Sequence, residues 1–190
     1  MRVTTLIDNR PAPQLTAEWG LAFWIEYQDK HILLDTGGGE NFARNAAALG
    51  IYLSRADFAV LSHAHWDHAD GLPAFFRRNP TAPLYLRQGC GEDCYDRTDR
   101  GWRYEGIRKG TLAEYADRIR FVSGPFSPAP GVSLLPHTTP GLAAKGKAGR
   151  MYRLRDGQYT PDDFSHEQSL VFQTARGLVI FNSCCHAGAD

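Results

Sequence analysis

The sequence lacks an excess of charge of either sign, because Lys and Arg total 21 and Asp and Glu also total 21. A neutral chain has no long-range field that would attract nucleic acid or an anionic membrane. No apolar run approaches the roughly 18 residues that a membrane span needs, and residues 1–13 lack the apolar core of a signal peptide. These absences predict a cytoplasmic protein that acts on a small molecule, with no nucleic-acid partner and no membrane partner.

Cysteine is scarce, and its four residues form two local pairs, Cys90 with Cys94 and Cys184 with Cys185. In a reducing compartment such cysteines are expected to be free thiols. A four-cysteine zinc site is an alternative, but adjacent residues on a strand point to opposite faces, which makes joint ligation by Cys184 and Cys185 awkward. The same geometry disfavours a nucleophile built from Cys185 and His186.

Several catalytic motifs are absent. No Gly-x-Ser-x-Gly elbow is present, which argues against a triad hydrolase. The glycines of residues 36–40 lack the spacing of a dinucleotide fingerprint or a P-loop and are typical of a tight turn. With 190 residues and 43% hydrophobic content, the chain can bury a core and is expected to form one domain, residues 1–190.

The pattern of apolar residues predicts a mixed α/β fold. Apolar runs at 169–174 and 178–183 flank a three-residue turn and are typical of a β-hairpin. Residues 88–110 and 138–150 are expected to be loops. Further strands are expected at 2–8, 21–27, 31–35, 58–62, 84–87, 131–135 and 151–154, and helices at 40–49, at 111–118 and from a cap at Asp70 to a stop at Pro80.

A cluster of histidines stands out, because three of the seven lie with an aspartate inside six consecutive positions: His63, His65, Asp67 and His68. Imidazole nitrogens and carboxylate oxygens are ligands that zinc prefers. His63 and His65 point to one side of an extended backbone, whereas Asp67 and His68 follow as the chain turns into a helix. The cluster therefore favours a site for one or two metal ions over the alternative of solvated loop histidines.

The stretch SHAHWDH, residues 62–68, resembles the His-x-His-x-Asp-His motif of the metallo-β-lactamase superfamily and has the same place between a buried strand and a helix. Residues 32–37, ILLDTG, resemble its Asp-Thr-Gly turn. Residues 17–27 and 162–188 resemble the dihydropteridine (methanopterin-pathway) synthase-like metallohydrolase branch, in which a His-Glu-Gln segment precedes a hairpin ending in a Cys-x-His-x-Gly motif. The resemblance implies an αββα four-layer sandwich of the α/β class.

The resemblance also implies roles for single residues. Asp35 is expected to orient the ligands. His166 is a candidate further ligand or proton-transfer residue, with a buried and hydrogen-bonded histidine as the alternative. His137 is assigned to a loop, because Leu142 occupies the position where related lactonases carry a ligand. The implied metal ligands are His63, His65, Asp67, His68 and His186.

The expected activity is metal-dependent hydrolysis, in which a metal-bound hydroxide oriented by Asp67 attacks an ester, lactone, amide or phosphoester. His166 or a second metal would assist the leaving group. Zinc is the expected ion, in one or two copies, with Mn²⁺ or Fe²⁺ as alternatives. Arginines of residues 97–109, with Trp102 and Tyr104, would suit an anionic aromatic substrate. The rival hypothesis is a non-catalytic metal-binding or ligand-binding module of the same fold.

Superfamily members continue with a helix and a last strand that carries a final histidine ligand, whereas this sequence ends at Asp190. The final helix and strand of the fold are therefore expected to be missing, which leaves the sandwich incomplete at its C-terminus. A fragment, a truncated member and a homo-oligomer in which another chain completes the site are the alternatives.

Overall fold

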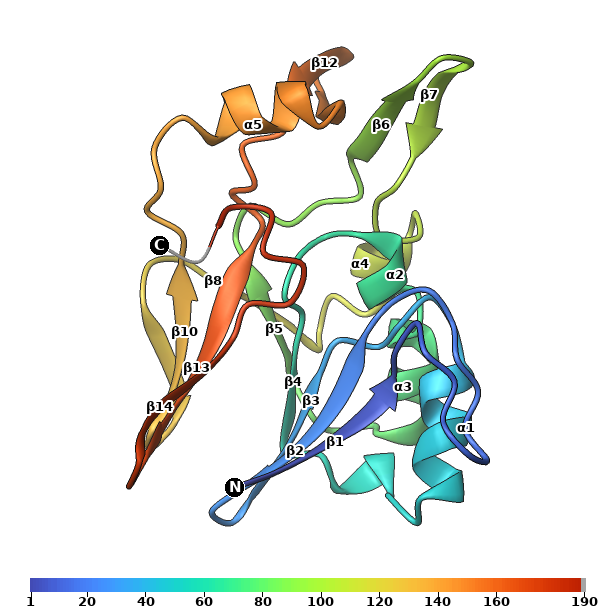
Figure 1. Ribbon diagram of the computed structural model, residues 1–190, viewed down its shortest axis with the longest axis vertical. Helices are drawn as coiled ribbons and strands as arrows, with labels where there is room; N and C mark the ends of the chain where they lie inside the picture. The colour runs from blue at the N-terminus through green and yellow to red at the C-terminus, as the bar shows by residue number, and fades with distance from the viewer. Residues whose placement is uncertain (189–190) are drawn as a thin grey trace.

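Two β-sheets packed face to face form the body of the molecule in the computed structural model, which describes residues 1–188 (Figure 1). The six-stranded sheet has the order β1-β2-β3-β4-β5-β8, with β1 Arg2–Ile7, β2 Ala22–Tyr27, β3 Lys30–Leu34, β4 Phe58–Val60, β5 Leu84–Arg87 and β8 Ile119–Val122. The opposing sheet has the order β14-β13-β10-β9, with β9 Phe126–Ala129, β10 Val132–Pro136, β13 Gln168–Thr174 and β14 Gly177–Phe181.

A third sheet stands apart from this body, at the top of Figure 1. Its order is β12-β11-β6-β7, with β6 Cys94–Thr98, β7 Gly101–Tyr104, β11 Met151–Arg155 and β12 Gln158–Pro161. The helices are α1 Asn41–Ala48, the 3-10 helix η1 Leu53–Arg55, α2 Trp66–Ala69, α3 Leu72–Arg78, α4 Thr111–Glu114 and α5 Leu142–Ala148. Within residues 1–188, no helix is long and apolar enough to cross a membrane.

The connections of the six-stranded sheet explain where polar side chains gather. Strands β1, β2 and β3 form an antiparallel meander, whereas β3, β4, β5 and β8 run parallel. Parallel neighbours need crossovers, and α1 and α3 supply two of them. Leu34 at the end of β3 pairs with Val60 at the end of β4. The residues that follow these strands, Asp35 and Ser62, therefore meet at one edge of the sheet.

Two apolar cores hold the layers together. Ile32 and Leu34 point from β3 into the core between the sheets, where Phe172 of β13 also lies. Leu33 points the opposite way, into the core that Phe42 of α1 shares. A strand buried on both faces has no need of polar alternation, which is why β3 and β4 appear as continuous apolar runs in the sequence. These cores fix the strand ends that carry the site.

The outer face of the four-stranded sheet is open at β14. Val179 and Phe181 pack toward the core between the sheets, whereas Leu178 and Ile180 are 66% and 57% exposed. This alternation is that of a strand with one covered face. Within residues 1–188 the helices leave this outer face uncovered at these two positions.

Most predicted elements are present, and the strand at 84–87 agrees with β5 at both ends. The prediction of a loop over 88–110 is wrong, because this segment contains the hairpin of β6 and β7. Its side chains are polar and aromatic on both faces, since the hairpin pairs with β11 instead of covering an apolar core. The sequence therefore carries little of the alternation that marks a half-buried strand.

The prediction of a loop over 138–150 is also wrong, because it contains α5. Gly141, Gly146 and Gly149 lie within or beside this helix, and glycine has a low helix propensity. A Cβ at Gly146 would lie 2.1 Å from the Asp162 carbonyl oxygen, so close packing requires the glycine there. The expected cap at Asp70 is displaced as well: α3 begins after Gly71, and the separate helix α2 precedes it.

Candidate metal centre

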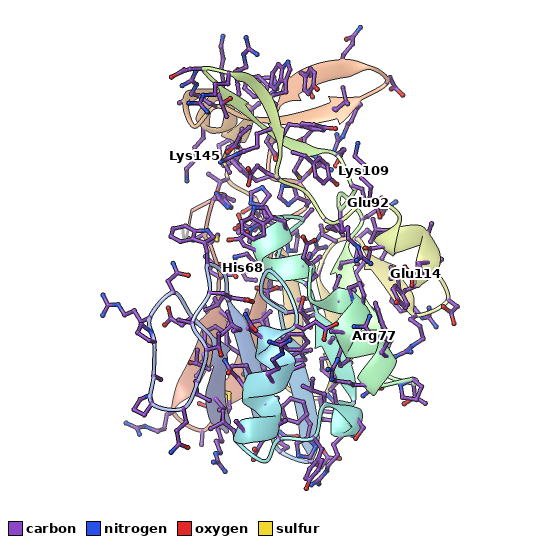
Figure 2. All side chains as sticks on the ribbon, turned by 90° about the vertical axis from the view of Figure 1, so that its right-hand side faces the viewer. His68, Arg77, Glu92, Lys109, Glu114 and Lys145 are labelled. Atoms are coloured by element: carbon purple, nitrogen blue, oxygen red, sulfur yellow. The ribbon has the colours of Figure 1, made fainter. Side chains whose placement is uncertain are left out.

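Four histidines converge where β3 and β4 end. The ring centroid of His63 lies 4.6 Å from that of His65, 4.3 Å from that of His68 and 5.1 Å from that of His186. Figure 2 shows His68 at the junction between the two-sheet body and the upper part of the molecule, where Lys109 and Lys145 lie. The site therefore lies at an edge of the sandwich, within reach of the third sheet.

One group of donor atoms comes from His63, His65 and His186, which lie within 4.8 Å of one another. Ser62 donates its hydroxyl hydrogen to Asp35 across 2.7 Å, so its oxygen accepts from His63 Nδ1 at 2.8 Å. The lone pair of His63 is consequently on Nε2. This nitrogen and His186 Nε2 are both buried and have no hydrogen-bond partner within residues 1–188.

The protonation of these rings suits a metal. Burial lowers the pKa of His63 and of His65 well below the usual range, and the neighbouring histidines add to the effect. Burial and the nearby His166 and His68 lower the pKa of His186 to about 4. All three imidazoles are neutral at pH 7, which is the form that binds a metal ion. The donor set therefore fits a divalent cation.

A second group joins His63 to His68 and Cys184. The Nδ1 hydrogen of His68 is donated to Asp35 across 2.8 Å, which leaves Nε2 facing Cys184 Sγ at 3.1 Å. Burial lowers the pKa of His68, but the Asp35 carboxylate outweighs it and holds that pKa well above its usual value. A carboxylate that orients a histidine in this way is typical of metal sites, and this contact is the one expected of Asp35.

Asp67 lies beside the second group. Its Oδ2 is 3.5 Å from His68 Nε2, and its side chain is 14% exposed. Burial raises the pKa of Asp67, whereas His68 and a hydrogen bond from Trp19 lower it by less. The carboxylate is thus placed between the buried histidines and the opening of the site.

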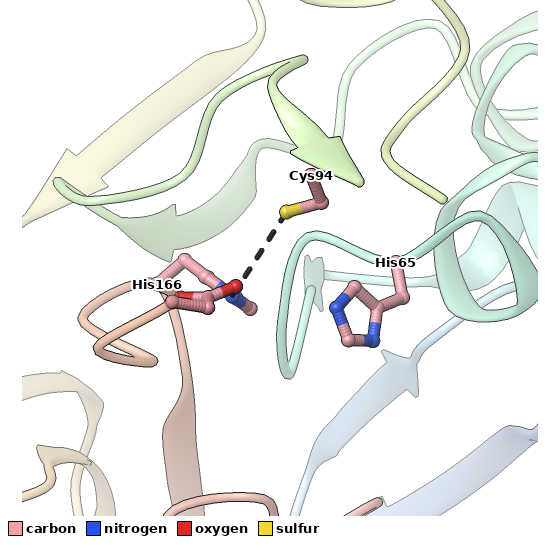
Figure 3. Close-up of side chains that lie close together, drawn as sticks. His65, Cys94 and His166 are labelled. Atoms are coloured by element: carbon pink, nitrogen blue, oxygen red, sulfur yellow. Dashed lines mark hydrogen bonds and ion pairs between the residues drawn. The ribbon is translucent and has the colours of Figure 1, made fainter. Parts of the chain in front are cut away.

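A third group of donors, His65, Cys94, Asp162 and His166, is buried. Figure 3 shows three of its members, His65, Cys94 and His166. Cys94 Sγ lies 4.0 Å from His166 Nε2. Burial raises the pKa of the Cys94 thiol well above its usual value, so it stays protonated. The carboxylate of Asp162 already faces two cationic or hydrogen-bonding groups, since His166 and Arg153 lower its pKa against the opposing effect of burial. These two partners already compensate the Asp162 carboxylate.

Both ring nitrogens of His166 are engaged. The Ala64 backbone N–H donates to Nδ1 across 3.0 Å, and Nε2 lies 3.1 Å from Asp162 Oδ2. His166, predicted to be a ligand or a proton-transfer residue, is therefore next to the histidine cluster but is hydrogen-bonded at both nitrogens.

The segment 182–188 brings Cys184 and His186 into the site. Ser183 and Cys185 have positive φ angles of 49° and 57°, a conformation that costs free energy in residues with a side chain. The Ser183 hydroxyl donates to Asp35 across 2.8 Å. The rings of Phe164 and His186 are parallel, with centroids 5.2 Å apart. This turn directs the side chains of both Cys184 and His186 toward the histidine cluster.

An open cavity of about 410 Å³ leads to the donors. Trp19, which is 66% exposed, stands at its mouth. Arg103 also lines it, but its guanidinium is paired with Asp96 at 2.9 Å and with Glu105. The lining residues are Trp19, His65, Trp66, Asp67, Asp96, Arg103, Glu105, Met151, Cys184 and His186.

The sequence pointed to Cys184 as a ligand only within the disfavoured four-cysteine site, and it did not identify Glu167 as a partner of the histidine site. The signal for Cys184 was its spacing of two residues from His186, which also relates His63 to His65. Cys94 and Cys184 belong to different donor groups, so the alternative of a joint four-cysteine site finds no support in residues 1–188. Glu167 accepts hydrogen bonds from backbone groups far along the chain, which no sequence pattern marks.

The fold and the site define a class of protein. Residues 18–170 match the family model of the metallo-beta-lactamase superfamily, and the chain belongs to this superfamily. The predicted αββα fold is thereby confirmed, as is the similarity to the dihydropterin synthase branch. That similarity rests on 7,8-dihydropterin-6-methyl-4-(beta-D-ribofuranosyl)-aminobenzene-5'-phosphate synthase of Methanocaldococcus jannaschii. It is 27% identical over 186 residues, which are 90% of this chain and 63% of the synthase.

Solved structures of the superfamily are similar to this chain in fold. Tm1679, described as a metal-dependent hydrolase of the beta-lactamase superfamily, is 28% identical and superposes with a TM-score of 0.79 over 98% of this chain and 66% of its own. A quorum-quenching N-acyl homoserine lactone hydrolase has a TM-score of 0.51 at 20% identity, over 85% of this chain and 59% of its own, and is similar in fold alone. The chain thus spans about two thirds of the length of these relatives.

Proposed function

We propose that this chain is a metal-dependent hydrolase of small molecules. The observation that carries the proposal is the pair of buried nitrogens, His63 Nε2 and His186 Nε2, which lack a hydrogen-bond partner within residues 1–188 and share one donor group with His65. A buried polar atom left unpaired costs about 1–3 kcal/mol. A cation between these rings would remove that cost at both nitrogens.

Zinc is the ion that the donors favour, in one or two copies. His63, His65 and His186 would hold one ion, and His68, Cys184 and Asp67 would hold a second. Imidazole suits zinc and iron alike, but a thiolate selects zinc over manganese. Fe²⁺ is the first alternative, and Mn²⁺ would require that Cys184 take no part.

When bound, zinc supplies a water of lowered pKa and polarises a carbonyl or phosphoryl oxygen. The residues of the chain position the reactants. Asp67 lines the cavity, where its carboxylate can accept a hydrogen bond from an attacking water and hold it toward the substrate. Asp35 keeps the Nδ1 hydrogen of His68 engaged, so that Nε2 is the ring nitrogen that faces the site.

The mouth of the cavity indicates the substrate class. Trp19 offers an exposed ring on which an aromatic group can stack. Arg103 is neutralised by its two carboxylate partners, so an ester or lactone with an uncharged aromatic part fits better than a phosphoester. The synthase relative favours a second candidate, a dihydropterin compound, whose flat ring would occupy the same place.

The test combines metal analysis with an activity panel. Wild type, His65→Ala and the control His31→Ala are purified, loaded with zinc and assayed for bound metal by mass spectrometry. Each is offered aryl esters, lactones, phosphodiesters, β-lactams and dihydropterin phosphates. We expect bound zinc and turnover of at least one class in wild type and His31→Ala, and less bound zinc and no turnover in His65→Ala.

Two outcomes would count against the proposal. A wild-type protein that takes up no transition metal would refute the site. A protein that binds zinc but turns over none of these classes would support the rival hypothesis, a non-catalytic metal-binding or ligand-binding module of the same fold.

A further inference from the structure

Three consecutive residues, His166, Glu167 and Gln168, are each at most 1% exposed and are polar. Each side chain forms a hydrogen bond with the backbone of a segment that carries the proposed ligands. We propose that this tripeptide, the 166–168 bracket, supplies no ligand and instead fixes the separation of the two ligand-bearing segments, 61–65 and 184–187. The inference rests on the proposed metal site and goes beyond it.

The role of His166 follows from its hydrogen bonds. A backbone N–H is always a donor, so the nitrogen that receives the Ala64 amide, Nδ1, carries no proton. In the neutral ring the proton is then on Nε2, where Asp162 accepts it at 3.1 Å. Coordination through Nε2 would leave the ring without any proton, as an anion. His166 therefore holds the amide of Ala64, which lies between the ligands His63 and His65.

Glu167 holds the other segment. Its Oε1 accepts from the His186 amide at 2.9 Å, and its Oε2 accepts from the Ala187 amide at 2.7 Å. Two consecutive amides can point at one carboxylate only if the backbone between Ser183 and Ala187 keeps its strained turn. The carboxylate thus offsets part of the cost of that turn and sets the direction of the His186 ring.

Gln168 completes the connection. Its backbone N–H donates to the Ser62 carbonyl across 2.9 Å, and its side-chain amide donates to the Leu61 carbonyl across 2.8 Å. These bonds tie the start of β13 to the residues that lead from β4 to His63.

The bracket is needed because the two ligand segments belong to different sheets. Residues 61–65 continue β4 of the six-stranded sheet, and residues 184–187 continue β14 of the opposing sheet. Apolar packing between sheets tolerates small shifts, whereas a metal ion requires its donors at about 2.0–2.3 Å. Hydrogen bonds to the groups that orient ligands typically change metal affinity by about 10–100-fold.

The experiment uses cobalt, whose visible spectrum reports the ligand set. The full chain is stripped with a chelator and titrated with Co²⁺ as wild type, His166→Asn, His166→Ala, Glu167→Gln and His186→Ala. Asn carries an oxygen close to the place of Nδ1 and can accept from Ala64. Asp163→Asn, an exposed carboxamide substitution on the same loop, is the matched control for Glu167→Gln. Circular dichroism verifies that each variant is folded.

We expect His166→Asn to bind cobalt nearly as tightly as wild type. His166→Ala and Glu167→Gln should bind about 10–100-fold more weakly, yet reach the wild-type spectrum at saturation. His186→Ala should show an altered spectrum, and Asp163→Asn should behave as wild type.

Other results overturn the inference. A saturated spectrum of His166→Asn that is altered as in His186→Ala would make His166 a ligand. Equal weakening by Asp163→Asn and Glu167→Gln would indicate a general charge effect. If Glu167→Gln fails to fold, the comparison of His166→Asn with His166→Ala decides alone. A wild type that binds no cobalt would overturn the proposed function and the bracket together.

Discussion

His68 donates its Nδ1 hydrogen to Asp35 across 2.8 Å, and neither side chain is more than 2% exposed. The same carboxylate accepts from the Ser62 amide, the Ser62 hydroxyl and the Ser183 hydroxyl. Asp35 thus connects the ends of β3 and β4 to the segment after β14. Asp35 is not one of the donors itself, yet it orients two of them, His68 directly and His63 through the Ser62 hydroxyl.

Replacing this carboxylate should weaken both the fold and the site. Asp35→Asn keeps the shape but presents an amide N–H to groups that are donors, so we expect the free energy of unfolding to fall by about 3 kcal/mol. Urea denaturation measures this change. Asp57→Asn is the control, because Asp57 also accepts from a backbone amide but its side chain is 35% exposed. A loss in Asp57→Asn as large as in Asp35→Asn would contradict the prediction.

The stability of the metal-free protein should fall on acidification. The pKa of His186 is about 4 in the folded protein, against an ordinary value of 6.5. Between these values the unfolded chain binds a proton that the folded chain does not, so stability decreases as the pH falls from 6.5 to 4. His63 and His65 shift in the same direction, whereas the raised pKa of His68 affects stability only above pH 6.5, outside this window.

Urea denaturation of chelator-treated protein from pH 7 to pH 4 tests this sign. His186→Ala should show a shallower dependence on pH than wild type over that window. An equal or steeper dependence in the variant would show that His186 does not contribute.

The four thiols should differ in reactivity. Burial raises the pKa of Cys90 to about 12 and that of Cys94 well above its usual value, and only the thiolate is nucleophilic. Iodoacetamide at pH 8 should therefore modify Cys184 and Cys185 in the native, metal-free protein, and Cys90 and Cys94 only after unfolding. Zinc should protect Cys184 if its sulfur is a ligand. Peptide mass spectrometry reports each position, and unchanged labelling of Cys184 with zinc would argue against its ligation.

Close backbone packing at Gly71 should make a methyl group costly. A Cβ there would lie 2.2 Å from the Thr36 carbonyl oxygen and 2.6 Å from that of Gly39. We expect Gly71→Ala to lower the free energy of unfolding by about 1–3 kcal/mol and to weaken metal binding, since Thr36 follows Asp35. Gly39→Ala is the matched control, because a Cβ at Gly39 meets nothing within 4 Å. Thermal unfolding of both variants measures the difference.

Much of the fold was accessible to sequence analysis because it depends on local patterns. β3 and β4 are continuous apolar runs, and α1 combines Ala with a glycine stop, so propensity and burial agree there. The hairpin of β6 and β7 and the helix α5 escaped prediction because partners distant in sequence stabilise them. Propensity is a weak guide when tertiary packing decides.

The candidate site divides in the same way. His63, His65, Asp67 and His68 lie within six positions, so their proximity in the folded protein could be predicted from the sequence. The position of Cys184 depends on the turn at Ser183, which the sequence does not reveal. The 166–168 bracket depends on hydrogen bonds between distant segments; Gln168 and Leu61, for example, are 107 positions apart. Nearly every residue type has the same backbone donor and acceptor, so the sequence does not indicate which backbone groups form these hydrogen bonds.

The long separation of the donors has a kinetic consequence. His68 and Cys184, 3.1 Å apart, are separated by 116 positions, so their contact forms only after most of the chain has been ordered. An ion held between them would stabilise the finished structure without guiding its formation. An ion bound there would oppose unfolding without accelerating folding, so chelation should accelerate unfolding far more than it slows refolding.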